Sequence, residues 1–288
     1  SNLGGGTGSN TGLGTRGVIA GGSDPVKNNM DFVTIPTLGN AQDFGDLTQA
    51  KFGGAGGGSR SRGVFMGGGT PTRLDEIDFI TFASTGNAQD FGDCAEGHRS
   101  QGAGVSNQTR ALYCGGSSPQ GVKNHIDLVT IATTGSGMKA GDLLGAGETQ
   151  AGSQSSTRGM IFGGNNDLDR IQFITIATTG DAQDFGTLNA ARNNVGSNAI
   201  SSNVRAIVGG GANSGGNQTQ TIDFVTIATT GNATDFGDLT VARMALNDVD
   251  DSVRGVFTGG QTPTTIVTMD FITIASAGDA KDFGDLNS

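Results

Sequence analysis

A short motif that begins with Arg and ends with Gly-Gly recurs six times along the chain. The first copy is RGVIAGG at 16–22, and successive copies begin 46 to 49 residues apart. Six such units fill a chain of 288 residues. A period near 50 that is rich in strand-forming residues is typical of β-propeller blades. We therefore predict an all-β fold in which residues 1–288 form one six-bladed β-propeller, with blades near 1–48, 49–95, 96–143, 144–189, 190–240 and 241–288.

A second motif, Asp-Phe-Gly, has nearly the same period. It occurs five times, and the last copy lies at 282–284. The same tripeptide binds magnesium in protein kinases, but a kinase needs it once per active site. The chain also lacks the strand Lys and the His-Arg-Asp loop that accompany it in kinases. The five copies therefore indicate a structural repeat rather than a phosphoryl-transfer site.

Each repeat predicts four strands. In the fifth repeat the second strand is the segment from Arg to Gly-Gly, the third is IDFVTIATT at 222–230, and the fourth is TDFGDLT at 234–240. The first strand is weaker and contains more Gly and Ser. Apolar residues lie on both faces of the third strand, as expected for a sheet that packs between two neighbouring sheets. Gly231 falls at the turn between the third and fourth strands, where it tolerates a positive φ.

The strand that ends in Gly-Gly, the following hairpin, the aromatic residue and the final basic residue of ATDFGDLTVAR (233–243) resemble the kelch repeat. The resemblance covers essentially the whole chain and implies kelch-type blades. The aromatic position, usually Trp in kelch proteins, holds Phe here, and the third repeat has Lys139 and Ala140 in place of Asp-Phe. That blade is expected to pack less tightly at its outer edge. The amino-acid sequence of the repeats is also similar to that of kelch-like tail-fibre and structural proteins of marine phages, especially cyanophages.

Composition narrows the classes of partner. The formal net charge is −10 and the isoelectric point is near 4.5, which argues against nucleic acid or an anionic membrane as the main partner. No apolar run approaches the ~20 residues needed to span a bilayer. The chain lacks an initiator Met, so we expect it to be processed or part of a longer protein. The two cysteines, Cys94 and Cys114, are expected to be small buried thiols.

The two ends of the predicted blades differ in variability. The turns between strands three and four barely change, as in ATTGNA, ASTGNA and ATTGDA, whereas the loops between strands two and three change freely. Recognition is commonly carried by variable loops on a rigid scaffold. The candidate binding residues on these 2–3 loops are Lys27, Asn28, Arg73, Asp75, Lys123, Asn124, His125, Asn165, Asp167, Arg170, Asn217 and Gln218.

The polar residues that repeat lie at the opposite end of the blades. An Arg begins each second strand and, in five repeats, an Asp precedes the Phe of the fourth strand. We expect structural ion pairs between the two sets rather than an anion-binding ring. The sets are Arg16, Arg62, Arg158, Arg205 and Arg254 on one side, and Asp43, Asp90, Asp184, Asp235 and Asp282 on the other. Arg110, whose own repeat offers Lys139, lacks such a partner.

No catalytic constellation, cofactor motif or metal-ligand spacing stands out. Copper chemistry of the galactose oxidase type needs two Tyr, and the chain has one. The resemblance implies a non-enzymatic module of a phage particle, at the virion surface and outside the cell. Its partners would be a host-surface glycan or protein, other virion proteins, or a further copy of itself. The alternatives are an architectural spacer and, less favoured, a glycan depolymerase that uses a pair of the loop acids Asp75, Glu76, Asp167 and Asp169.

The closure of the ring allows two arrangements. Residues 1–15 could supply the first strand of blade one, so that the ring closes by packing of blade six against blade one. Alternatively the same segment could complete blade six as a clasp. The sequence does not choose between the two.

Overall fold

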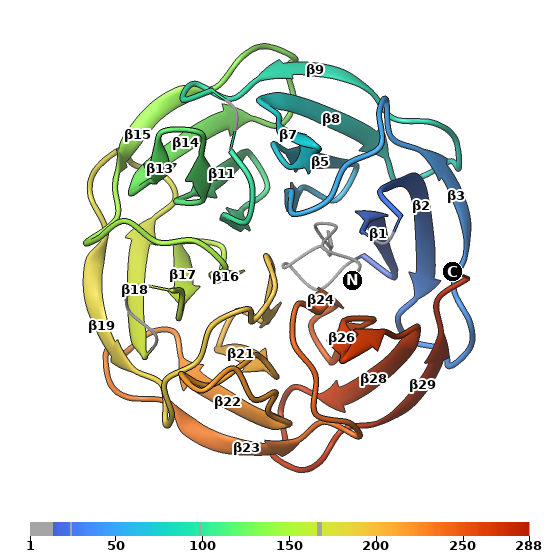
Figure 1. Ribbon diagram of the computed structural model, residues 1–288, viewed down its shortest axis with the longest axis vertical. Helices are drawn as coiled ribbons and strands as arrows, with labels where there is room; N and C mark the ends of the chain where they lie inside the picture. The colour runs from blue at the N-terminus through green and yellow to red at the C-terminus, as the bar shows by residue number, and fades with distance from the viewer. Residues whose placement is uncertain (1–13, 24, 98, 166–168, 288) are drawn as a thin grey trace.

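The structure, a computed structural model, is a ring of six β-sheets arranged around a central axis (Figure 1). It describes residues 14–23, 25–97, 99–165 and 169–287. Both arrangements proposed for residues 1–15 therefore lie almost entirely outside the described residues. Strands and turns make up the described part of the chain, which contains no helix and hence no helix that could cross a membrane. The six-bladed β-propeller predicted from the repeat period is confirmed.

Five of the sheets have four antiparallel strands, and the first blade shows three in its described part. Strand one is innermost: β4 (Ala55–Gly58), β10 (Ala103–Ser106), β16 (Ala151–Gln154), β20 (Ile200–Ser201) and β24 (Asn247–Asp250). Strand two is the Arg-to-Gly segment: β1 (Arg16–Gly22), β5 (Arg62–Met66), β11 (Arg110–Cys114), β17 (Arg158–Phe162), β21 (Arg205–Gly209) and β25 (Arg254–Thr258).

Strands three and four complete each blade towards the rim (Figure 1). Strand three is β2 (Lys27–Thr34), β8 (Glu76–Thr81), β14 (His125–Thr130), β18 (Arg170–Thr175), β22 (Thr221–Thr226) and β28 (Thr268–Thr273). Strand four is β3 (Gln42–Asp46), β9 (Gln89–Asp93), β15 (Met138–Asp142), β19 (Gln183–Thr187), β23 (Thr234–Asp238) and β29 (Lys281–Asp285). Both strands end earlier than predicted: in the fifth repeat strand three ends at Thr226, before the Ala-Thr-Thr segment of the turn, and strand four ends at Asp238.

The cores lie between adjacent blades. The residues of one such core come from blades four and five together, including Met160, Phe185 and Val208. In five blades the Phe of strand three meets the Phe of strand four edge-on, with ring centroids 5.8 to 6.2 Å apart. Blade three has Leu128 and Ala140 at these positions and lacks the ring pair. Cys94 and Cys114 are buried and free, as predicted, and burial raises the pKa of each thiol to about 12.

The same backbone contact joins every pair of neighbouring blades. In the seam between blades one and two, the Gly86 amide donates to the Phe44 carbonyl at 2.7 Å, and the Ala88 amide donates to the Asp46 carbonyl at 2.8 Å. The Asp46 amide in turn donates to the Asn87 side-chain oxygen at 3.1 Å. The equivalent bonds occur at the other five seams, including the one that closes the ring, where Gly39 and Ala41 bond to Phe283 and Asp285.

This seam explains why Asp-Phe-Gly repeats. Gly45 has a φ of 140°, and a Cβ there would lie 2.5 Å from the backbone of Gly86 in the next blade. Only glycine allows so close an approach of the two chains. Strand four also carries a bulge at this point, where the register shifts between Met30 and Asp31 of the paired strand. The tripeptide is therefore part of the joint between blades.

Candidate functional site

The repeated arginines have partners other than those predicted. Each guanidinium donates a hydrogen bond to a carbonyl at the end of strand three of the next blade, as when Arg62 Nη1 donates to Ile131 O at 2.9 Å. In five blades it also lies over the Phe of its own strand three, 4.4 to 4.7 Å from the ring centroid. Arg110 shares the carbonyl contact through Ile176 and Ala177.

The ion pairs expected between two repeated sets are thus replaced by contacts across the seams. No described ion pair joins Arg16, Arg62, Arg158, Arg205 or Arg254 to Asp43, Asp90, Asp184, Asp235 or Asp282. These aspartates are exposed, and Asp90 accepts a hydrogen bond from the amide of Gly92 at 3.0 Å. The arginine reaches over the flat ring towards the neighbouring blade because strand two places it at the blade edge.

The structure contains a different and more deeply buried set of ion pairs. The basic residue that precedes strand one pairs with the Asp of strand three in four blades: Lys51–Asp78, Arg99–Asp127, Arg192–Asp223 and Arg243–Asp270. Their N–O distances are 2.6 to 3.0 Å and all eight side chains are almost fully buried. Blade four has Gly147 and Gln172 at these positions. This joint substitution was the sequence signal for the pairing, and it was missed.

The described candidate binding residues all lie on the 2–3 loops or at the start of strand three, as predicted, and are exposed or half-buried. Asp167 lies outside the described residues. Three of the loops contain small extra hairpins: β6 (Gly69–Thr70) with β7 (Thr72–Arg73), β12 (Ser117–Ser118) with β13 (Gly121–Val122), and β26 (Gln261–Thr262) with β27 (Thr264–Thr265). We call the surface formed by these loops the 2–3 loop face.

Contacts between loops are concentrated at blades two and three. Arg73 Nη2 donates to Ser117 Oγ of the next blade at 2.8 Å, so the two hairpins are tied together. Asp75 and Asn124 bond through their backbone carbonyls to the amides of Cys94 and Leu143. The other candidates, Lys27, Asn28, Asn165, Arg170, Asn217 and Gln218, belong to blades one, four and five.

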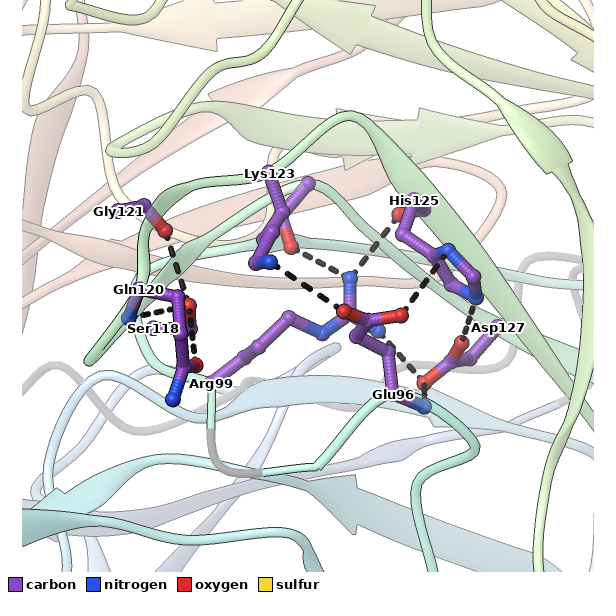
Figure 2. A network of polar contacts seen from close by, with 9 residues as sticks. Glu96, Arg99, Ser118, Gln120, Gly121, Lys123, His125 and Asp127 are labelled. Atoms are coloured by element: carbon purple, nitrogen blue, oxygen red, sulfur yellow. Dashed lines mark hydrogen bonds and ion pairs between the residues drawn. The ribbon is translucent and has the colours of Figure 1, made fainter.

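A charged network lies behind the blade-three hairpin (Figure 2). Lys123 Nζ is 3.3 Å from Glu96 Oε1, and the two ring nitrogens of His125 face Glu96 Oε2 at 3.4 Å and Asp127 Oδ1 at 3.2 Å. Beneath them Arg99 binds Asp127 and donates to the carbonyls of Gly115 and His125. Sequence reasoning found Lys123 and His125 but missed Glu96, Arg99 and Asp127.

The pKa values of His125, Asp127 and Glu96 each depend on burial and on the charges of their neighbours. Burial lowers the pKa of His125, opposed by the charge of Asp127 and reinforced by that of Arg99. Burial raises the pKa of Asp127 despite the opposing charges of Arg99 and His125. For Glu96, burial acts to raise the pKa, but the hydrogen bond from Lys123 and the charge of His125 outweigh it and lower the pKa overall. A neutral imidazole donates from one nitrogen, so it can satisfy only one of the two carboxylates.

Of the acids considered for a hydrolytic pair, Asp167 lies outside the described residues. Glu76 accepts hydrogen bonds from Thr48 and Gln49, while Asp75 is half-buried and Asp169 is exposed. Within the described residues there is no group of three His, Cys, Asp or Glu side chains that could hold a metal ion. The single Tyr, Tyr113, is fully buried and lies under the guanidinium of Arg99, so its ring is not presented on a surface.

Comparison with known proteins adds no family to this picture. No protein-family model matches the chain, and no curated protein matches it either.

Proposed function

We propose that this propeller is a non-enzymatic binding module of a phage particle, a tail-fibre or virion-surface adhesin whose 2–3 loop face contacts a host-surface glycan or protein. The observation that carries the proposal is the contrast between the two ends of the blades. At one end six equivalent backbone seams fix the turns, and at the other the loops differ in length, charge and hairpin content. A rigid frame with variable loops is a common design for recognition.

The kelch-type resemblance and the likeness to marine phage structural proteins supply the biological setting of the proposal. The net charge of −10 suits a partner other than nucleic acid or an anionic membrane. The buried Tyr and the absence of Trp mean that a glycan would be held by amides, hydroxyls and charged groups rather than by ring stacking. No cofactor or metal is part of the proposal.

The test is binding of the purified protein to intact marine bacterial cells, cyanobacteria first. Variants exchange the loops 69–76 and 211–221 for each other, and a matched control changes Thr85 and Thr134 to Ser in exposed turns at the opposite end. Loss of cell binding in the loop variants, with the control unaffected, would support the adhesin. A folded protein that binds no cell in the panel would refute it and favour the architectural spacer.

A further inference from the structure

One of the four buried ion pairs differs from the other three in its chemistry. Blade two pairs Lys51 with Asp78, whereas the equivalent cation is an Arg in blades three, five and six. A guanidinium stays charged in proteins and is not a nucleophile, but a lysine amine that has lost its proton is one. Of the four pairs, therefore, only Lys51 and Asp78 can react with each other.

The contact between these two side chains is close but is not a hydrogen bond. Lys51 Nζ lies 2.7 Å from Asp78 Oδ2, and both side chains are buried, with exposed fractions of 4% and 0%. Neither of these two atoms has a hydrogen-bond partner within the part of the chain that the structure describes. By contrast, Arg99 Nη2 and Arg243 Nη1 each donate a hydrogen bond to the Asp of their own blade. The Lys51 amine thus touches the carboxyl group without the hydrogen bonds that a buried ammonium needs.

A second carboxyl group lies next to the pair. Thr48 Oγ is within hydrogen-bond distance of both Glu76 Oε1 and Asp78 Oδ1. A hydroxyl has one hydrogen to donate, and an ionised carboxylate can only accept. Both contacts are therefore hydrogen bonds only when one of the two carboxyl groups carries a proton and donates it to Thr48 Oγ. This arrangement holds a proton beside the oxygen of Asp78 that does not contact the lysine.

The sequence has this combination of residues in blade two alone. In blade six the Thr240 hydroxyl donates to Asp270 Oδ1 at 2.6 Å, as Thr48 contacts Asp78 in blade two. The cation of that blade is an Arg, however, and the residue two positions before the Asp is Thr268 where blade two has a Glu. A buried ion pair thus forms in blade six without lysine and without a second carboxyl group, so the ion pair itself does not require them.

We propose that Lys51 and Asp78 become joined by an intramolecular amide bond. In the reacting state the lysine is a neutral amine, and Asp78 carries a proton on Oδ1. The Nζ atom attacks Cγ of Asp78, the C–N bond forms, and the C–Oδ1 bond breaks. Oδ1 leaves as water, with its own proton and one proton from the nitrogen. An ammonium and a carboxylate thereby become one amide and one water, so the step needs no oxidant, reductant or cofactor.

The surroundings of the pair favour this reaction. Burial deprives an ammonium and a carboxylate of their hydration, whereas the amide and the water are both neutral. The fold also holds the two groups in contact, which replaces an encounter between separate molecules. Thr48 is exposed, so the released water has a path to solvent. Glu76 acts through Thr48 and is a positioning residue, which keeps the hydroxyl and its proton next to Asp78.

The bond would join the connector that precedes β4 to strand β8 of the same blade. The inference does not depend on the adhesin function. Its test is the intact mass of the purified, denatured protein, which we expect to be one water molecule below the mass calculated from the sequence. Trypsin should not cut after Lys51, and peptide 28–60 should remain joined to peptide 74–99.

The matched control is Lys51→Arg, which copies the ion pair of three other blades and cannot form the amide. We expect this variant to have its full calculated mass. A second variant, Glu76→Gln, should fold but lose water incompletely, and Glu76→Asp should restore the loss. The fraction of protein that has lost water is a readout that a merely structural role of Glu76 would not change.

Two results would overturn the amide bond. If the unaltered protein has its full calculated mass, Lys51 and Asp78 form an ion pair like the other three. If Lys51→Arg shows the same loss of water, the water has been lost elsewhere in the chain. The tryptic peptides of the unaltered protein decide the point even if a variant does not fold. Complete loss of water in Glu76→Gln would overturn the part assigned to Glu76.

Discussion

The two faces of the propeller are made from the same six repeats, yet they accept change to very different degrees. On the turn face, the backbone of one blade bonds to the backbone of the next at every seam, and glycines such as Gly45 leave no room for a side chain. On the 2–3 loop face, backbone bonds between blades lie near the axis, as where the Gln101 amide donates to Gly53 O at 2.6 Å. The outer parts of the loops meet through side chains, as between Arg73 and Ser117. The repeated residues of this chain are therefore those that join neighbouring blades. The residues that vary are those whose contacts with other blades the fold does not require.

The largest loss of stability is expected at the buried ion pairs rather than at either face. Arg243→Met should destabilise the protein by about 3 to 5 kcal/mol, because it leaves Asp270 buried without its partner. Chemical denaturation measures this directly. The matched double variant Arg243→Met with Asp270→Asn removes both buried charges and should recover most of the loss. A double variant as unstable as the single one would show that the pair is not an exchangeable unit.

The seams can be probed with two glycines that face each other. Gly45→Ala should cost about 3 kcal/mol, since its Cβ would collide with the backbone of Gly86 and its φ of 140° is unfavourable for alanine. Gly86→Ala should cost only about 1 kcal/mol, because a Cβ there meets no atom within 4 Å and only the φ of 152° is unfavourable. Equal losses, measured by thermal or denaturant unfolding, would contradict the account of the seam as a close backbone contact.

An acidic residue on the innermost strand of blade six predicts a pH dependence. Burial raises the pKa of Asp250 from 3.8 to about 8, opposed by its hydrogen bonds from Ser201. Its protonated form is favoured in the folded state, so this contribution to stability is full below pH 4 and is lost as pH rises to about 8. Asp250→Asn should remove that decline, giving a flatter plot of unfolding free energy against pH than the unaltered protein. Parallel plots for the two proteins would disprove the assignment.

The smallest effects on stability are expected on the 2–3 loop face. Asn28→Ala and Asn217→Ala should change the free energy of unfolding by less than about 0.5 kcal/mol, because both side chains are exposed. If either costs more than 1 kcal/mol, the loop contributes to the frame and the contrast between the two faces weakens.

The fold was predictable because the length of the repeat and its strand-forming residues indicate propeller blades, and each strand could be placed from one repeat. The partners of the repeated arginines were not, because Arg62 reaches Ile131 in the next blade, 69 residues away, and a single repeat does not show what its neighbour presents. The candidate residues lie on the 2–3 loops as the repeats predicted, and their role in binding stays a prediction. Glu96 and Asp127, which flank His125, were overlooked. In the sequence Asp127 is one strand residue among many, and Glu96 lies in a connector without a motif. Only the fold of blade three brings both next to His125.

The equivalence of the six seams has a mechanical consequence. A pulling force on one blade, directed in the plane of the ring, acts on two backbone hydrogen bonds at each seam with a neighbouring blade. The seam between blades six and one has the same two bonds as the other five. Tension that enters at any point of the circumference is therefore shared among six equivalent pairs of backbone bonds on the turn face.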